Sequence, residues 1–92
     1  MSTERYELMS ILTKKFPKMW MKESEEFGAP RNGIWTGEGS YDNDGCEMFN
    51  YYANPTSTLY DMGINKELVD ILDEHGWFAE WYDSGTVLIY KQ

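Results

Sequence analysis

The sequence predicts an α+β fold: a single antiparallel β-sheet, built from a meander and a C-terminal hairpin, with two helices packed on one face in the order α-β-β-β-α-β-β. Two observations predict it. Apolar residues recur at helical spacing near residues 4–15 and 66–75. In the other segments, side chains alternate between the two faces of a strand, and clusters of turn-forming residues separate these segments. Because 92 residues are the size of one domain, residues 1–92 are expected to fold as a single unit.

The first helix is expected over residues 4–15, because its apolar side chains form a stripe with a period near 3.6 residues. The stripe consists of Leu8, Met9, Ile11, Leu12 and Phe16. Ser2 or Thr3 is expected to cap the helix, and Pro17 is expected to end it. Lys14 and Lys15 near its C-terminus suit the helix dipole.

Three strands are expected between the helices. Residues 18–23 alternate imperfectly and predict a short strand, and residues 34–36 follow the turn former Asn32-Gly33. Residues 46–53 follow Asp44-Gly45 and predict a longer strand with large apolar groups on both faces. Asn54-Pro55 is expected to end this strand.

The second helix is expected over residues 66–75, with Asn65 as its N-cap and Gly76 as its stop. Its apolar face consists of Ile64, Leu68, Ile71, Leu72 and His75. Residues 77–82 and 86–91 then predict a hairpin around a three-residue loop in which Gly85 takes the left-handed position.

Aromatic residues are unusually frequent, with 15 Phe, Trp and Tyr against 13 Val, Ile and Leu. Both faces of the predicted hairpin carry large apolar groups, whereas two short helices suffice to cover one face. Either a second copy or another protein partner covers the remaining face, or residues 23–33 and 54–63 fold over it. The expected interface residues are Trp77, Phe78, Trp81, Tyr82, Leu88 and Tyr90.

The charge is strongly acidic and unevenly distributed. Residues 1–31 hold 6 basic and 5 acidic side chains (+1), residues 32–92 hold 2 and 11 (−9), and the sum is −8. This balance argues against direct nucleic-acid or membrane binding, which depends on Lys and Arg. On the second helix, Glu67, Asp70 and Glu74 share one strip, which is either a solvated face or a phosphate-like row for a basic partner.

The sequence contains no motif for catalysis or for a cofactor. Cys46 and His75 are the only cysteine and histidine, and their spacing gives a thiol–imidazole pair no support. Asp42, Asp44 and Glu47 suggest an oxygen-lined cation site, but the register does not match an EF-hand loop, and Asx turns explain the same residues. We therefore expect no catalytic residue, cofactor or metal.

The tryptophans allow one further alternative, because Trp20, Trp35, Trp77 and Trp81 are either core residues or a platform for stacking on sugars. No apolar run approaches the length of a membrane helix, the N-terminal residues are polar, and a single cysteine suits a reducing compartment. The sequence thus predicts a soluble, cytoplasmic, non-enzymatic module that self-associates through an aromatic-rich sheet face, as a homodimer, or binds another protein partner there. An acidic inhibitor of a basic protein is the alternative.

Overall fold

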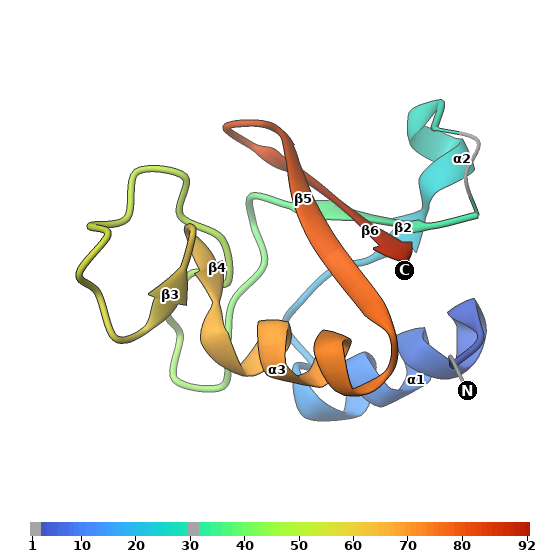
Figure 1. Cartoon of the computed structure of the whole chain (residues 1–92), viewed down its shortest axis with the longest axis horizontal. Coiled ribbons are helices and arrows are strands. Elements are labelled where there is room, and N and C mark those ends of the chain that lie inside the picture. The colour runs from blue at the N-terminus through green and yellow to red at the C-terminus, as the bar shows by residue number, and fades with distance from the viewer. Residues whose placement is uncertain (1–2, 30–31) are drawn as a thin grey trace.

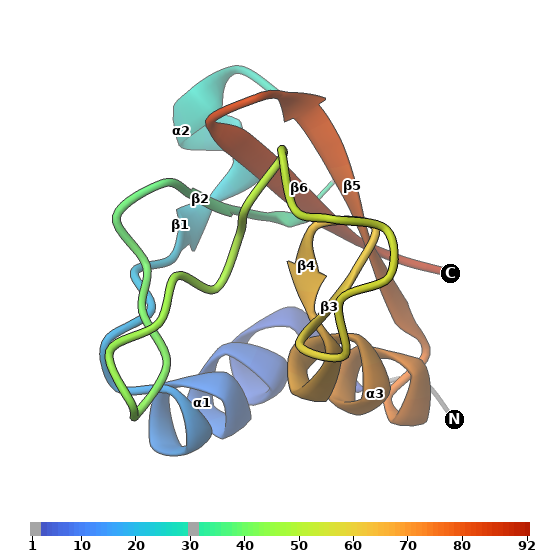
Figure 2. The same cartoon turned by 90° about the vertical axis from the view of Figure 1, so that its left-hand side faces the viewer.

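The computed structural model describes residues 3–29 and 32–92 and has two layers built around a four-stranded antiparallel sheet of order β1-β2-β6-β5. Helices α1 and α3 lie side by side under this sheet, and the short helix α2 lies at its other side (Figures 1 and 2). The elements are α1 (Arg5–Lys15), β1 (Lys22–Glu23), α2 (Ser24–Phe27), β2 (Ile34–Gly37), β3 (Tyr60–Asp61), β4 (Ile64–Asn65), α3 (Lys66–Glu74), β5 (Trp77–Asp83) and β6 (Thr86–Lys91).

The predicted α+β class is confirmed, but the predicted single sheet is not fully matched. Strands β3 and β4 pair with each other in a separate two-stranded sheet. Helix α2, which the sequence did not predict, begins with a capping box between the side chains and main-chain N–H groups of Glu23 and Glu26. In the part of the chain that the structure describes, no helix has the length and apolar character needed to cross a membrane.

Helix α1 confirms the predicted first helix, except at its cap. Glu4 occupies the N-cap position without a side-chain hydrogen bond to the helix. Of the predicted caps, Ser2 lies outside the described residues, and Thr3 does not cap α1, because its hydroxyl lies 2.6 Å from Nδ1 of His75. Thr3 is thus bonded to His75 at the end of α3 rather than to α1.

Helix α3 and the paired strands of the hairpin agree closely with their predictions, but the prediction for Gly85 is wrong, because Gly85 is not among the residues with a positive φ. The Asn65 side chain accepts a hydrogen bond from the main-chain N–H of Leu68 at 3.1 Å, as an N-cap should. Strands β5 and β6 pair in the register Ala79 to Ile89, with an irregularity between Trp81 and Asp83.

The strand predicted over residues 46–53 is wrong. This segment makes only isolated bridges, Tyr41 with Glu47 and Phe49 with Ile64. The Asn50 side chain accepts a hydrogen bond from the main-chain N–H of Tyr52, and this local Asx turn competes with strand pairing. The strand predicted over residues 18–23 is reduced to the two residues of β1.

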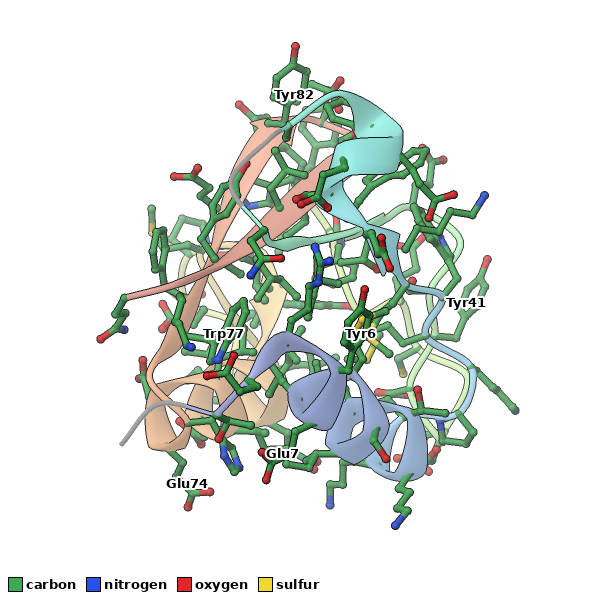
Figure 3. All side chains as sticks on the ribbon, turned by 90° about the vertical axis from the view of Figure 1, so that its right-hand side faces the viewer. Tyr6, Glu7, Tyr41, Glu74, Trp77 and Tyr82 are labelled. Carbon is green, nitrogen blue, oxygen red and sulfur yellow. The ribbon has the colours of Figure 1, made fainter. Side chains whose placement is uncertain are left out.

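The core lies between the sheet and the α1–α3 layer. The inner face of the sheet presents fully buried side chains from β2 and β6, and α1 and α3 add their apolar stripes. These residues are Ile34, Val87, Ile89, Leu8, Leu12, Leu68 and Leu72. Trp77 is buried in the same core, and Figure 3 shows it between the hairpin and the helices.

The opposite face of the sheet is partly covered by this chain's own helix α2. The Phe27 ring of α2 packs 5.1 Å from the Trp35 ring and 4.8 Å from the Tyr82 ring. Leu88 and Tyr90 on this face are buried. Of the two loops expected to cover this face, the described part of residues 23–33 covers some of it through α2, whereas residues 54–63 lie beside Trp81 on the core side.

Arg5 connects α1 to this cover. Its buried guanidinium donates to Oε1 of Glu25 at 2.7 Å and to the main-chain carbonyl of Gly33 at 3.2 Å. A hydrogen bond from its own main-chain N–H, followed by the bond from Arg5, lowers the pKa of Glu25. Because the pKa of Glu25 is lower in the folded protein than in the unfolded chain, the ionised carboxylate stabilises the fold. This stabilisation is present above the pKa of the unfolded chain and is lost as pH falls through the pKa of the folded protein.

Candidate functional site

Two adjoining hollows open where residues 47–63 meet the end of the hairpin. Figure 2 shows the backbone of this segment in front of the β5–β6 hairpin. Tyr51 and Trp81 line both of them. The larger hollow has a volume of about 460 Å³ and is lined by Tyr51, Ala53, Pro55, Met62, Gly63 and Trp81. The smaller hollow has a volume of about 200 Å³ and is lined chiefly by Phe49, Tyr51, Tyr52, Trp81, Glu38 and Glu47.

The β3–β4 hairpin holds residues 48–53 in place. The main-chain N–H of Asn50 donates to the carbonyl of Gly63 at 2.7 Å, and that of Asn65 donates to the carbonyl of Met48 at 2.8 Å. The Asx turn at Asn50 then directs the next two residues outward. Tyr51 and Tyr52 are consequently exposed, Tyr52 to 82%.

The aromatic rings of the smaller hollow stand nearly at right angles to one another. The Tyr51 ring lies 5.3 Å from the Tyr52 ring at 81° and 5.1 Å from the Trp81 ring at 88°. The Phe49 ring lies 6.4 Å from the Trp81 ring at 83°. Such edge-to-face contacts are attractive in themselves, and they fix ring planes that enclose a space from several sides.

Met62 occupies a strained position at the mouth of the larger hollow. It has a φ of 54° and is followed by Gly63 with a φ of 82°, so both central residues of the β3–β4 turn are left-handed. A left-handed residue with a side chain costs about 1–3 kcal/mol, and asparagine or glycine usually fills such a turn. The Met62 side chain is 86% exposed, so burial of the thioether does not offset this cost.

The two carboxylates of the smaller hollow stand on fixed backbone. The N–H of Glu38 donates to the carbonyl of Gly85 at 3.0 Å, and the carbonyl of Glu38 accepts from Nε1 of Trp20 at 2.8 Å. The carbonyl of Glu47 accepts from the Tyr60 hydroxyl at 2.7 Å. Partial burial, followed by repulsion from Cys46, Glu47 and Asp42 at the alkaline pH where Tyr60 ionises, raises the pKa of Tyr60. The electrostatic field beside the hollow is therefore negative.

Of the six interface residues predicted from the sequence, only Trp81 lines either hollow. Trp77, Leu88 and Tyr90 are buried by this chain itself. Phe78 is half-buried, and Tyr82 is 63% exposed but packs against Phe27, on the other side of the sheet from Trp81. In this structure, the predicted set does not form one continuous surface.

Sequence reasoning missed Tyr51, Tyr52 and Met62 as surface residues. The strand predicted over residues 46–53 contains Tyr51 and Tyr52, and Met62 falls in the loop of residues 54–63. Two signals were available: Asn50 before the tyrosine pair is a turn former, and Met62-Gly63 stands where a two-residue hairpin turn takes left-handed residues.

The acidic strip of α3 points to solvent. Glu67, Asp70 and Glu74 are all exposed, and Figure 3 shows Glu74 directed away from the molecule. Glu67 pairs with Nζ of Lys15 at 3.3 Å across the α1–α3 layer. The strip lies on a different element from the two hollows.

The other candidates do not assemble into sites. Cys46 is exposed, and His75 contacts Thr3. Oδ1 of Asp42 accepts from the main-chain N–H groups of Asp44 and Cys46, both at 2.9 Å, as in an Asx turn. Within residues 3–29 and 32–92, no cluster of three or more His, Cys, Asp or Glu side chains is arranged to hold a metal ion.

The four tryptophans do not form a flat platform for a sugar. The Trp20 and Trp35 rings meet at 89° with their centroids 5.4 Å apart, and Trp77 is in the core. Trp81 alone lines the hollows. Comparison with known proteins adds no relative, because no family model, no curated protein and no solved structure matches this chain.

Proposed function

We propose that the protein is a non-enzymatic binding module that docks a basic protein partner on the surface of the two hollows. The observation that carries this proposal is the gathering of exposed Tyr51, Tyr52 and Met62 around the half-buried Trp81. Tyrosine, tryptophan and methionine are the residues enriched at protein interfaces. The cytoplasmic location expected from the sequence is part of the same proposal.

The shape of this surface supports docking rather than catalysis. The larger hollow is open and is lined mainly by apolar groups, so it suits an apolar anchor side chain of a partner. Met62 lies at the opening of this hollow, in a left-handed turn position where asparagine or glycine would be more stable. A flexible thioether adapts well to a partner's shape.

The charge of the chain supports a basic partner. Among the described residues that line the two hollows, none is Lys, Arg or His, and the smaller hollow carries Glu38 and Glu47. With a net charge of −8, a second copy would meet like charge across such an interface. Self-association, which the sequence also predicted, is therefore the less favoured form of this proposal.

A titration followed by NMR tests the proposal. The probes are peptides that combine Lys or Arg with one Leu or Phe, together with matched peptides in which Glu replaces each basic residue. The basic peptides are expected to shift the Trp81 indole N–H and the amides of residues 50–63. They should leave the buried Trp77 indole, which donates to the Thr3 carbonyl at 2.7 Å, unmoved.

A matched pair of variants sharpens this test, because Tyr52 and Tyr82 are both exposed tyrosines. Tyr52→Ser is expected to weaken basic-peptide binding by about fivefold or more, and Tyr82→Ser is expected to leave it unchanged. Shifts confined to α3 would instead support the acidic strip of Glu67, Asp70 and Glu74. Concentration-dependent dimers in sedimentation, with shifts at Phe78 and Tyr82, would support self-association.

A further inference from the structure

We propose that the smaller hollow receives one alkylammonium group, the ε-ammonium of a lysine side chain on the partner. This inference rests on the proposed function, since it names the group that the basic partner inserts. It combines three observations on the same few residues: perpendicular aromatic rings, two carboxylates on fixed backbone, and no Lys, Arg or His among the described residues that line the hollow.

The ring geometry favours an ammonium over a guanidinium. An ammonium is compact and nearly spherical, so it contacts several rings that meet at right angles, as Tyr51 does with Tyr52 and with Trp81. A guanidinium is planar and stacks best parallel to one open ring face. The volume of about 200 Å³ also leaves room for methyl groups on the nitrogen.

The carboxylates supply charge complementarity from two separate segments. Glu38 follows β2 and Glu47 precedes Met48, and main-chain hydrogen bonds to Gly85 and from Tyr60 fix the two positions. Both side chains are exposed in the free protein, so the fold does not depend on a partner group bound to either carboxylate. Because the backbone is already fixed, binding needs little further ordering of the chain.

Three cations among the described residues lie over other aromatic rings. Arg5 lies over Tyr6 at 5.0 Å, Lys22 over Trp35 at 5.5 Å and Lys91 over Trp77 at 6.0 Å. Among the residues that the structure describes, no such contact involves Tyr51, Tyr52 or Trp81. The fold therefore already uses cation–π contacts, and the rings of the smaller hollow are available for a cation from another molecule.

The test titrates the full chain with four small amides of equal backbone: acetyl-lysine methylamide with a free ε-ammonium, its ε-trimethylated form, the arginine analogue and the uncharged norleucine analogue. Both ammonium compounds are expected to shift the signals of Tyr52, Glu47 and the Trp81 indole. They should bind about fivefold or more tightly than the other two. Equal binding of the arginine or norleucine compound would overturn the inference.

Two substitutions of equal charge change locate the site. Glu47→Gln is expected to weaken binding of the lysine amide about fivefold, whereas Glu80→Gln, on exposed β5, is expected to change it less than twofold. Among the described residues, the Glu47 side chain makes no hydrogen bond or ion pair, since its bond to Tyr60 and its bridge to Tyr41 are made by the main chain. Equal effects of the two substitutions would show a general charge effect and would overturn the site.

The two proposals fail in different ways. If lysine amides bind in the smaller hollow while no basic peptide binds, the alkylammonium site stands and the proposed docking function fails. If basic peptides shift only residues 53–63 while lysine amides leave Tyr52 and Glu47 unmoved, the docking function stands and the alkylammonium site fails.

Discussion

The indole Nε1–H of Trp81 donates a hydrogen bond to the main-chain carbonyl of Met62 at 2.8 Å. This bond joins the edge strand β5 to the separate β3–β4 hairpin, and it holds the turn that presents the Met62 side chain. Trp81 also contacts the Tyr51 ring at 5.1 Å. One residue thus sets the relative position of the three segments that form the two hollows.

Replacing Trp81 with Phe is expected to lower the free energy of unfolding by about 0.5–1.5 kcal/mol. The substitution keeps a six-membered aromatic ring at this position, but it removes the part of the indole that carries the N–H donor. Amide exchange of Asn50, whose N–H donates to Gly63, should become faster. Chemical denaturation and hydrogen exchange measure the two effects. Trp20→Phe is the control, since it also loses an indole bond to a carbonyl, that of Glu38. Equal acceleration at Asn50 in both variants would contradict the link.

Gly63 and Gly45 form a matched pair that separates steric contact from backbone conformation. Their φ angles are 82° and 84°, but a Cβ at Gly63 would lie 2.6 Å from the carbonyl oxygen of Asn50, whereas a Cβ at Gly45 meets nothing within 4 Å. Gly45→Ala is expected to cost about 1–2 kcal/mol from the left-handed backbone alone.

Gly63→Ala is expected to cost about 2 kcal/mol more than Gly45→Ala, because the contact is with main chain and the Asn50 turn must move. Urea denaturation of the two variants measures the difference. Gly63→Ala should also weaken the binding of basic peptides at the two hollows, since the Asn50 turn positions Tyr51 and Tyr52. Similar stability of both variants would mean that residues 49–53 are not held by the β3–β4 hairpin.

Local signals in the sequence were sufficient to predict α1, α3 and the β5–β6 hairpin. In α3, Asn65 as N-cap, the apolar stripe and Gly76 all favour the same helix, so tertiary contacts had nothing to override. The α2 cover was not predictable in the same way. It depends on Arg5, which bonds Glu25 from 20 residues away, and no local pattern encodes that contact.

The candidate site was mispredicted because residues 46–53 have strand-like composition but turn-like hydrogen bonding. Alternation in Cys46 to Ala53 favoured a strand, whereas the Asn50 side chain competes for the backbone and turns it. Leu88 and Tyr90 are buried on the face that α2 partly covers, and α2 is distant from them in sequence. The alternation of side chains along a strand predicts the face of the sheet on which each one lies. It does not predict which segment of the chain packs over that face.

Met62→Asn is expected to stabilise the protein by about 1 kcal/mol, because asparagine tolerates the left-handed conformation that Met62 adopts. Little buried apolar area is lost, since Met62 is 86% exposed. Under the proposed function, the same change weakens basic-peptide binding. Thermal unfolding and the peptide titration measure the two outcomes.

Met62→Ala is the control for this prediction, because it removes the thioether but keeps a Cβ in the same left-handed position. It is expected to weaken peptide binding without the gain in stability. Equal stabilisation by Asn and Ala would show that backbone strain at residue 62 is not the cause.

Tyr60 is expected to make the protein less stable at alkaline pH. Partial burial, followed by the nearby negative charge, raises the pKa of its hydroxyl above the unfolded value near 10. As pH rises through that value, the unfolded chain loses this proton before the folded one, so the folded state holds more protons and its stability falls. The stabilisation is fully present below the unfolded pKa.

Tyr60→Phe removes both the ionisable group and the 2.7 Å hydrogen bond to the Glu47 carbonyl. The variant is expected to be about 0.5–1.5 kcal/mol less stable than the natural chain at pH 7. The difference in free energy of unfolding between the two proteins should narrow above about pH 10, because only the natural chain is destabilised by ionisation of Tyr60. Urea denaturation of both proteins from pH 7 to pH 11 measures it, and every other ionisable group contributes equally to the two curves. Curves that run parallel over this range would contradict the assignment of the alkaline loss to Tyr60.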